Sequence, residues 1–574
     1  MTTGVSDGSP SSSPSNGSVS STASTETCVA SVSSTGESPF SSSTSPLVTR
    51  PVAILPCGSS LLKEPLTASR RPSPGPPPSR RRSCRRFWHA FGRRVTLFFT
   101  VLFATVSGIL FGYDSGYING VMAMDFFDNM HLRLPPQPRW FHLPAKDKVK
   151  LVGALSLGTF FGSFAGSDLA DWVGRRTVLF LGTIFYSLGV LDQYLSNEIN
   201  WLARGRFEAG LGIGAISAVV VVYLVETSHS DWRGWLVMIY QIAITLGMLI
   251  SYGVTFSTMS WWDIKSYQIP IGLQFLWVGM LFSLLLFLPE SPRWCVKTGQ
   301  VDRARHTLSR LTGKLLGDEW LEAEVGGMLE ESPLGHSCEY TLRQAFFESW
   351  SCCWWGKARN PGSHFRRTLL ATMIMVFQQL IGVNIVFYFA ISVFKQHKFD
   401  CSPFVLALVL ASVNMLSTLV CCYPVLDLRR RVLLIGGALA MAVCQLTVGI
   451  TTWAWYWTGD NKTAEHSPTW LMVLTMVGMS LYVFFFASSW GPGAWILIGE
   501  IFPTQIRARA VGIATAANWA TNSVICYLVP VLIEPDGRDI GLGVLTITGI
   551  FSIFAAAFVY FWVPETEGKT LEEL

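Results

Sequence analysis

Apolar runs of about 20 residues recur along most of this chain of 574 residues. Folded as a helix, a run of that length crosses the roughly 30 Å of hydrocarbon in a bilayer. Only 14% of the residues are charged and 50% are hydrophobic, whereas a soluble protein of this size needs more charge to cover its surface. The sequence therefore predicts an all-α membrane protein that crosses the lipid bilayer several times.

Twelve transmembrane helices are expected from the apolar runs. They lie near 95–121, 149–167, 177–195, 204–225, 235–256, 270–288, 368–394, 403–426, 432–453, 469–490, 509–533 and 541–562. A cytoplasmic connection over 289–366 divides them into two six-helix bundles, which occupy 94–288 and 367–563. The connection begins with an amphipathic pattern from Arg303 to Leu311, which predicts a helix there.

Basic residues gather at the ends of alternate spans, so the positive-inside rule places both termini in the cytoplasm. Residues 1–93 are rich in Ser, Thr and Pro and are expected to be a disordered tail, and residues 564–574 form the C-terminus. The arginines over 80–94 fit a topology anchor, while phosphorylation of the tail would give it a regulatory role. Asn461 opens an Asn-Lys-Thr sequon in an outer loop, which is either glycosylated or an unused match.

Span seven carries three side-chain amides, Gln378, Gln379 and Asn384, and the phenol of Tyr388. Amides cost free energy in hydrocarbon unless they are hydrogen-bonded, so they face a polar ligand or a water-filled path, or they bond neighbouring helices. Because amides pair with hydroxyls at no net charge, a neutral, hydroxyl-rich ligand such as a sugar is expected.

The spacing of these amides also predicts the shape of span seven. Gln378 and Asn384 are six residues apart, which on a straight helix is about 240° of rotation. Gly382 lies between them. We therefore expect span seven to bend near Gly382 and to move during the working cycle.

The two halves of the chain repeat the same short patterns in the same order. Arg175-Arg176 follows span two as Arg430-Arg431 follows span eight. A glutamate precedes an arginine by seven residues in both halves, and each half closes with Pro-Glu. This predicts a parallel repeat of six spans, as in transporters whose two bundles rock about a central site.

The chain resembles the sugar porters of the major facilitator superfamily, and among them the hexose carriers of fungi. The resemblance runs from about Phe98 to Leu574. The motifs that carry it are Phe111-Gly112-Tyr113-Asp114, Asp171 to Arg176, Gly205-Arg206-Phe207, Tyr223 to Glu226 with Arg233-Gly234, Pro289 to Trp294, Gln378 to Tyr388, Trp490-Gly491-Pro492 with Trp495, Glu500 to Pro503 and Pro564 to Gly568. It implies a twelve-helix fold of two bundles and a plasma-membrane carrier that moves a monosaccharide, a hexose such as glucose, by alternating access.

By this resemblance the substrate-binding residues are amides and aromatic residues of the central spans. They are Gln241, Gln378, Gln379, Asn384, Phe387, Tyr388, Asn414, Trp495, Asn518, Trp519 and Asn522. The chemistry agrees, because a sugar ring presents a C–H face to an aromatic ring and hydroxyls that both donate and accept hydrogen bonds. For each lone residue the alternatives are an interhelical hydrogen bond or ordinary core packing.

Asp114 and Arg206 stand in predicted spans one and four. A carboxylate that meets an arginine in only one state changes its proton affinity between states, which would couple transport to protons. In proton-linked members of the resembled family the matching aspartate has this role. A static ion pair with downhill transport is the alternative, because facilitative carriers keep the aspartate as well.

Charged residues at the inner helix ends are implied to form a gate of salt bridges between the bundles while the site faces out. They are Arg175, Arg176, Glu226, Arg233, Glu290, Arg430, Glu500 and Arg507. The alternative is a role in topology and solvation alone, since exposed pairs contribute little each.

The remaining features exclude other classes of protein. A net charge of +5, with basic residues at membrane edges, argues against nucleic acid as a partner. No catalytic pair, phosphate loop or metal cluster is recognisable, so neither an enzyme nor a cofactor or metal is expected. The rival interpretation is a sugar sensor of the same fold. Many such sensors carry a long C-terminal cytoplasmic tail, whereas this chain stops at Leu574.

Overall fold

A computed structural model describes residues 80–124, 127, 144–228, 233–330, 353, 363–396, 401–457, 468–502, 506–533 and 541–564. In these residues the secondary structure is helical and contains no strand, which confirms the all-α fold class. The glycosylation sequon at Asn461, residues 1–79 and residues 565–574 lie outside the described residues.

The first half of the chain forms six spans. They are α1 (Arg80–Val121), α3 (Ala145–Val173), α4 (Arg175–Leu195), α5 (Ile199–Thr227), α6 (Arg233–Thr258) and the pair α7 (Lys265–Gly272) and α8 (Gln274–Phe287). Short helices follow, namely α9 (Pro292–Lys297), α10 (Val301–Thr312) and α11 (Glu319–Glu330). Helix α10 covers the amphipathic segment predicted at Arg303 to Leu311, with Ala304 and Leu308 buried.

The second half contains the remaining spans. They are α13 (Ser363–Leu380) with α14 (Val383–Gln396), α15 (Pro403–Asp427), α16 (Arg430–Trp457), α17 (Thr469–Ser488) with α18 (Trp490–Ile501), α19 (Arg507–Ile533), and α20 (Val544–Trp562) after the short 3-10 helix η4 (Gly541–Gly543). Among the described residues, 10 helices are long and apolar enough to cross a membrane, or 11 with the bent pair α13 and α14. Helix α19 has 27 residues but carries arginines and asparagines, which lower its apolarity.

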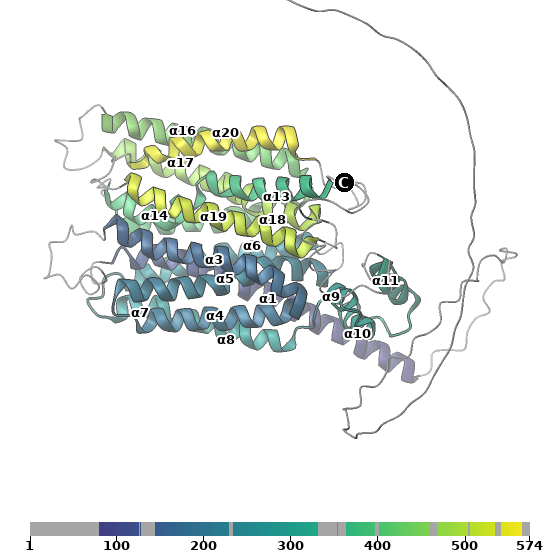
Figure 1. Cartoon of the computed structure of the whole chain (residues 1–574). Helices are drawn as coiled ribbons and strands as arrows, with labels where there is room; N and C mark the ends of the chain where they lie inside the picture. Colours follow the sequence, from purple (N-terminus) through teal and green to yellow (C-terminus); the bar gives the residue numbers. More distant parts are fainter. Residues whose placement is uncertain are drawn as a thin grey trace, which may run out of the picture. The chain divides into compact units, whose positions relative to one another are not determined.

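Helices from each half pack mainly against one another, and two seams join the halves (Figure 1). In the first half α3 packs on α5 and α1 on α6, and in the second α16 packs on α20 and α13 on α19. The seams between the halves are α3 against α19 and α6 against α15. Glycine makes the α3–α5 contact close: a Cβ at Gly158 would lie 2.2 Å from the carbonyl oxygen of Phe207.

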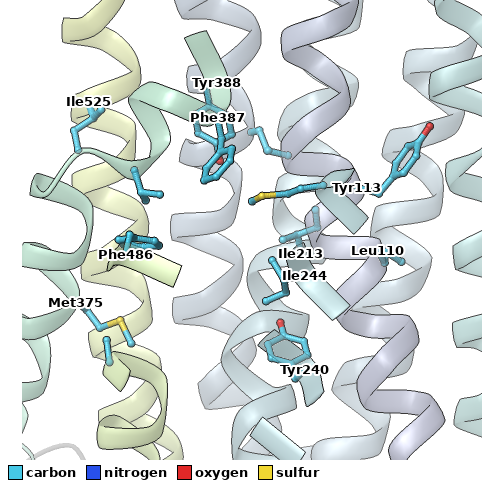
Figure 2. Close-up of a cluster of buried hydrophobic side chains, with 14 of the residues drawn as sticks. Leu110, Tyr113, Ile213, Tyr240, Ile244, Met375, Phe387, Tyr388, Phe486 and Ile525 are labelled. Carbon is cyan, nitrogen blue, oxygen red and sulfur yellow. The ribbon is translucent and has the colours of Figure 1, made fainter. Parts of the chain in front are cut away.

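Span seven is broken where the sequence predicts. Helix α13 ends at Leu380, α14 begins at Val383, and the two are bent by 44°. Gly382 has φ +91, a conformation that favours glycine. The buried apolar side chains of both halves meet beside this break, where Phe387 and Tyr388 lie between residues such as Met375 and Phe486 and residues such as Ile244 and Leu110 (Figure 2).

Candidate binding cavity between the two halves

A cavity with about 650 Å³ of empty space lies between the two halves, at the level of the break in span seven. Helices α1 and α6 form one wall, and α13, α14, α15, α18 and α19 contribute most of the other. Ten predicted site residues line it, namely Gln241, Gln378, Gln379, Asn384, Phe387, Tyr388, Asn414, Trp495, Asn518 and Trp519. The bend at Gly382 brings the side chains of Gln378 and Asn384 to the same cavity.

The amides on the second-half wall are bonded to one another. The Gln379 side chain donates from Nε2 to Asn518 Oδ1 at 2.7 Å and accepts from Asn384 Nδ2. Asn518 Nδ2 donates to Gln378 Oε1 at 3.0 Å. Gln378 in turn donates to the Trp490 carbonyl at 3.0 Å, where α17 gives way to α18. Each of these amides is hydrogen-bonded to another neutral group. A hydroxyl of a ligand can therefore take the place of one of these partners.

Aromatic rings complete the wall. Phe387 and Tyr388 come from α14, and both are almost fully buried. Trp519 packs edge-on against Phe111 of α1, with ring centroids 5.6 Å apart. Its buried indole N–H has no hydrogen-bond partner among the described residues. A donor beside aromatic faces suits a ligand with both hydroxyls and an apolar ring face.

Asn522 is the predicted site residue that does not line the cavity. It lies behind the wall, where its Oδ1 accepts from Asn384 Nδ2 at 2.8 Å. Its own Nδ2 donates to Ser156 Oγ of α3 at 3.0 Å, across the seam between the halves. Asn522 therefore links the cavity wall to the opposite half.

Several lining residues were not predicted, among them Ser115, Thr245 and Met248. The hydroxyls of Ser115 and Thr245 donate to carbonyls of their own helices, at Phe111 and Ile242, so they are compatible with any apolar span. Met248 Sδ lies 3.8 Å from Asn414 Nδ2. The sequence feature that could have pointed to Ser115 as a lining residue was its position directly after Asp114.

Asp114 and Arg206 form a fully buried ion pair inside the first half. Arg206 Nη1 lies 3.1 Å from Asp114 Oδ1, and both side chains are 0% exposed. The same nitrogen donates to the Tyr117 hydroxyl at 3.0 Å, and the Tyr186 hydroxyl donates to Asp114 at 3.5 Å. Neither charged residue is a wall residue of the cavity. A charge this deeply buried depends on its partner, so any change in the pair changes proton affinity.

A second charged cluster lies where α3 meets α4, beside the start of α9. Arg175 holds Glu226 with two bonds, at 3.0 and 3.1 Å, and Asp171 with a third at 3.1 Å. Glu290 accepts from the backbone N–H groups of Arg175 and Arg176 at 3.0 to 3.2 Å. Burial raises the pKa of Glu290, although these N–H groups act in the opposite direction.

The predicted gate pairs join residues of the same half. Arg175 pairs with Glu226 in the first half, and Arg430 Nη2 lies 3.7 Å from Glu500 Oε1 in the second. Arg176 donates to the carbonyls of Leu285 and Leu286, and Arg507 donates to the Phe502 carbonyl at 3.0 and 3.1 Å. The Arg233 side chain lies outside the described residues.

Among the described residues, an ion pair that bridges the two halves involves Arg509, which was not predicted for the gate. Its Nε lies 3.3 Å from Asp168 Oδ1 and 3.7 Å from Asp171 Oδ2, both on α3. Lys297 Nζ also bonds Asp171, at 3.0 Å. Through Asp171, the charges of the first half and Arg509 of the second form one network.

Neutral groups join the halves near the middle of α14. The Phe387 carbonyl accepts from Asn119 Nδ2 at 3.1 Å and from the Tyr252 hydroxyl at 2.6 Å. Asn119 belongs to α1 and Tyr252 to α6. The halves are thus bonded at α14 and at Asn522 through neutral groups and at Arg509 through charges. Among the described residues, no group of three or more His, Cys, Asp or Glu could hold a metal ion.

Two helical halves around a central cavity define the fold of the major facilitator superfamily. The proton:xylose symporter XylE of E. coli, solved with bound 6-bromo-6-deoxy-D-glucose, is similar with a TM-score of 0.67 and 25% identity. The match covers 84% of this chain and 98% of that protein.

Sequence comparison narrows the class to a family. Residues 100–574 match the family model described as sugar (and other) transporter. The chain is 33% identical to the probable glucose transporter rco-3 of Neurospora crassa, over 82% of this chain and 77% of that protein. It is 31% identical to the high glucose sensor RGT2 of Saccharomyces cerevisiae, over 82% of this chain and 59% of that protein. The chain belongs to the sugar transporter family of the major facilitator superfamily.

Proposed function

We propose that this protein carries a monosaccharide, a hexose such as glucose, across the plasma membrane by alternating access, with both termini in the cytoplasm. The observation that supports this is the cavity between the halves, which neutral amides and aromatic rings line together. Uncharged donors and acceptors beside apolar ring faces match a pyranose, whereas a charged substrate would need counter-charges in the wall. Of the charged side chains described, none lines the cavity.

Alternating access requires contacts between the halves that form and break. The hydrogen bonds from Asn119 and Tyr252 to the Phe387 carbonyl are one such set, and the pairs of Arg509 with Asp168 and Asp171 are another. In this proposal the cavity opens to the outside when the first set of contacts breaks, and to the cytoplasm when the second set breaks. The remaining charged residues at helix ends hold each half rigid, so that the halves move as bodies.

We further propose that transport is coupled to protons through Asp114. The Asp114–Arg206 pair is buried without lining the cavity, so protonation of Asp114 would act on the bundle rather than on the sugar. A downhill carrier with a static pair is the alternative. The 25% identity to a proton:xylose symporter supports the coupled form.

A non-transporting sugar sensor is the second candidate, because a relative at 31% identity is named as a high glucose sensor. A sensor would bind the same sugar in the same cavity and respond to it without carrying it through. Surface expression with sugar binding but without uptake would identify a sensor.

The deciding experiment expresses the full chain in cells that lack hexose carriers and follows uptake of labelled glucose. A panel of unlabelled sugars then gives the substrate preference by competition. A protonophore that abolishes accumulation supports symport, whereas unchanged downhill uptake supports facilitation. Absence of uptake at normal surface expression contradicts the carrier proposal.

A further inference from the structure

The break in span seven leaves a backbone carbonyl deep inside the second half. Ile381 lies between α13 and α14, and its carbonyl has left the regular helical ladder. In a membrane interior such a group needs a partner from the protein, because water and lipid supply none. The amide of Gln445, from α16, donates to this carbonyl at 2.6 Å, and the Tyr482 hydroxyl, from α17, donates at 3.2 Å.

Gln445 is itself held on every side. Its Nε2 also donates to Thr548 Oγ1 at 3.0 Å, and its Oε1 accepts from Ser552 Oγ at 2.8 Å, both on α20. Gln445, Tyr482 and Ser552 are almost fully buried. None of the residues that support the corner lines the cavity, namely Gln445, Tyr482, Thr548 and Ser552. A glutamine buried this completely in an apolar helix is costly unless it is hydrogen-bonded, and the bonds of Gln445 connect the break in span seven to α20.

The corner also fits closely against α20. A Cβ on Gly382 would lie 2.6 Å from Thr548 Cγ2, so the backbone of the break packs directly on the residue that supports Gln445. Helices α16, α17 and α20 therefore hold the corner from behind, on the side away from the cavity.

The two arms of the corner carry different parts of the candidate site. Gln378 and Gln379 are on α13, whereas Asn384, Phe387 and Tyr388 are on α14. The bond from Asn384 Nδ2 to Gln379 Oε1 spans the corner. The angle between the arms thus decides whether the amides of both helices reach one ligand.

We propose that Gln445 is a positioning residue for the sugar site, which fixes the angle between α13 and α14 by holding the Ile381 carbonyl. This inference rests on the proposed function, since it assigns Gln445 to the same site. Gln445 does not touch the sugar. It sets the distance between the amides that do.

The test is Gln445→Leu, which keeps a similar volume and removes all three hydrogen bonds. We expect the KM for sugar uptake to rise about tenfold, equivalent to about 1.4 kcal/mol of lost binding. Tyr482→Phe removes the bond to the Ile381 carbonyl, and Ser552→Ala removes the bond to Gln445 Oε1 together with one to the Thr548 carbonyl. Each should raise KM about two- to threefold, or roughly 0.4 to 0.7 kcal/mol. Thr447→Val is the matched control, because Thr447 lies on the exposed face of the same helix and bonds only the Val443 carbonyl.

A purely structural role would give a different pattern. It would lower the amount of carrier at the surface, and hence the maximal rate, at an unchanged KM. That result for Gln445→Leu overturns the proposal. If Gln445→Leu does not reach the membrane, Ser552→Ala and Tyr482→Phe with wild-type KM values overturn it instead. Failure of the wild type and of Thr447→Val to transport any sugar would count against the proposed function, separately from Gln445.

Discussion

The two halves of this protein bury their polar groups in different chemical forms. In the first half Asp114 and Arg206 form an ion pair that is fully buried and absent from the cavity wall. In the second half neutral amides, such as Gln379 and Asn518, are buried and line the cavity. The first half thus buries a pair of charges away from the cavity, and the second half buries neutral donors and acceptors on its wall.

This difference has an energetic meaning. A typical hydrogen bond between neutral groups contributes a net of about 0.5 to 1.5 kcal/mol, so an amide can exchange an amide partner for a sugar hydroxyl at little cost. Separation of a buried ion pair costs about 3 to 5 kcal/mol when one charge is left uncompensated. Exchange of partners among the amides of the second half is therefore cheap, whereas separation of the Asp114–Arg206 pair is costly.

Asp114→Asn gives the sharpest test of that division. Asparagine keeps the shape and still accepts a bond from Arg206, but it takes up no proton near neutral pH. We expect accumulation against a gradient to disappear, with the internal to external ratio falling to about one, while sugar exchange persists. Vesicles with an imposed pH gradient would measure both.

The matched control is Asp192→Asn, which alters an aspartate paired with Arg204 outside the buried cluster. It should accumulate sugar as the wild type does. Uphill uptake by Asp114→Asn would instead assign the Asp114–Arg206 pair a static role.

Gln379→Ala tests the neutral half. The side chain bonds both Asn518 and Asn384, so its loss removes the proposed ligand group and leaves Asn518 Oδ1 without its donor and Asn384 Nδ2 with one partner fewer. An unsatisfied buried group costs about 1 to 3 kcal/mol, and we expect KM to rise about tenfold or more. Initial uptake rates over a range of sugar concentrations would measure it. Asn200→Ala, at an exposed amide, should keep the wild-type KM, and a wild-type KM in Gln379→Ala would remove Gln379 from the binding surface.

Much of this arrangement could be predicted from the sequence, because hydrocarbon leaves few choices. Apolar runs of membrane length predicted the helices. Gly382, between two amides that a straight helix would point in different directions, predicted the bend, which is confirmed by the 44° angle and by φ +91 at this glycine. A buried amide needs a partner, so the residues of α13 and α14 could be assigned to a common polar space. The cavity gathers ten of the eleven predicted residues for the same reason.

The depth of a residue along its helix axis and the direction in which its side chain faces could not be predicted in the same way. Asn518 and Asn522 share a helical face, but one turn separates them by about 5 Å along the axis, and only Asn518 reaches the cavity. Arg507 and Arg509 differ by about 200° of rotation, and the repeat between the halves selected Arg507 although Arg509 meets α3. Gln445 belongs to no motif, and its role depends on a carbonyl more than 60 positions away in the sequence.

Arg509→Gln would sharpen the comparison at the charged seam. The variant loses the pairs with Asp168 and Asp171, while Asp171 keeps Arg175 and Lys297 as partners. We expect the cytoplasmic side to open more readily, which raises the KM for influx about threefold and lowers the KM for efflux. Zero-trans influx and efflux assays measure the two values. Arg310→Gln, at an exposed position in α10, serves as the control, and equal changes in both directions would contradict a gating role for Arg509.

Asn522→Ala should have the smallest effect of the four, although Asn522 was predicted to bind sugar. Its amide supports Asn384 from behind and bonds Ser156, so its loss loosens the wall without removing a ligand group. We expect KM to rise about two- to threefold, against about tenfold for Asn518→Ala, whose amide lines the cavity. Side-by-side uptake curves for the two variants at matched surface expression make the measurement. An equal rise in KM for both asparagines would mean that Asn522 reaches the sugar in the loaded state, and that the neutral wall extends one helical turn deeper than the cavity described.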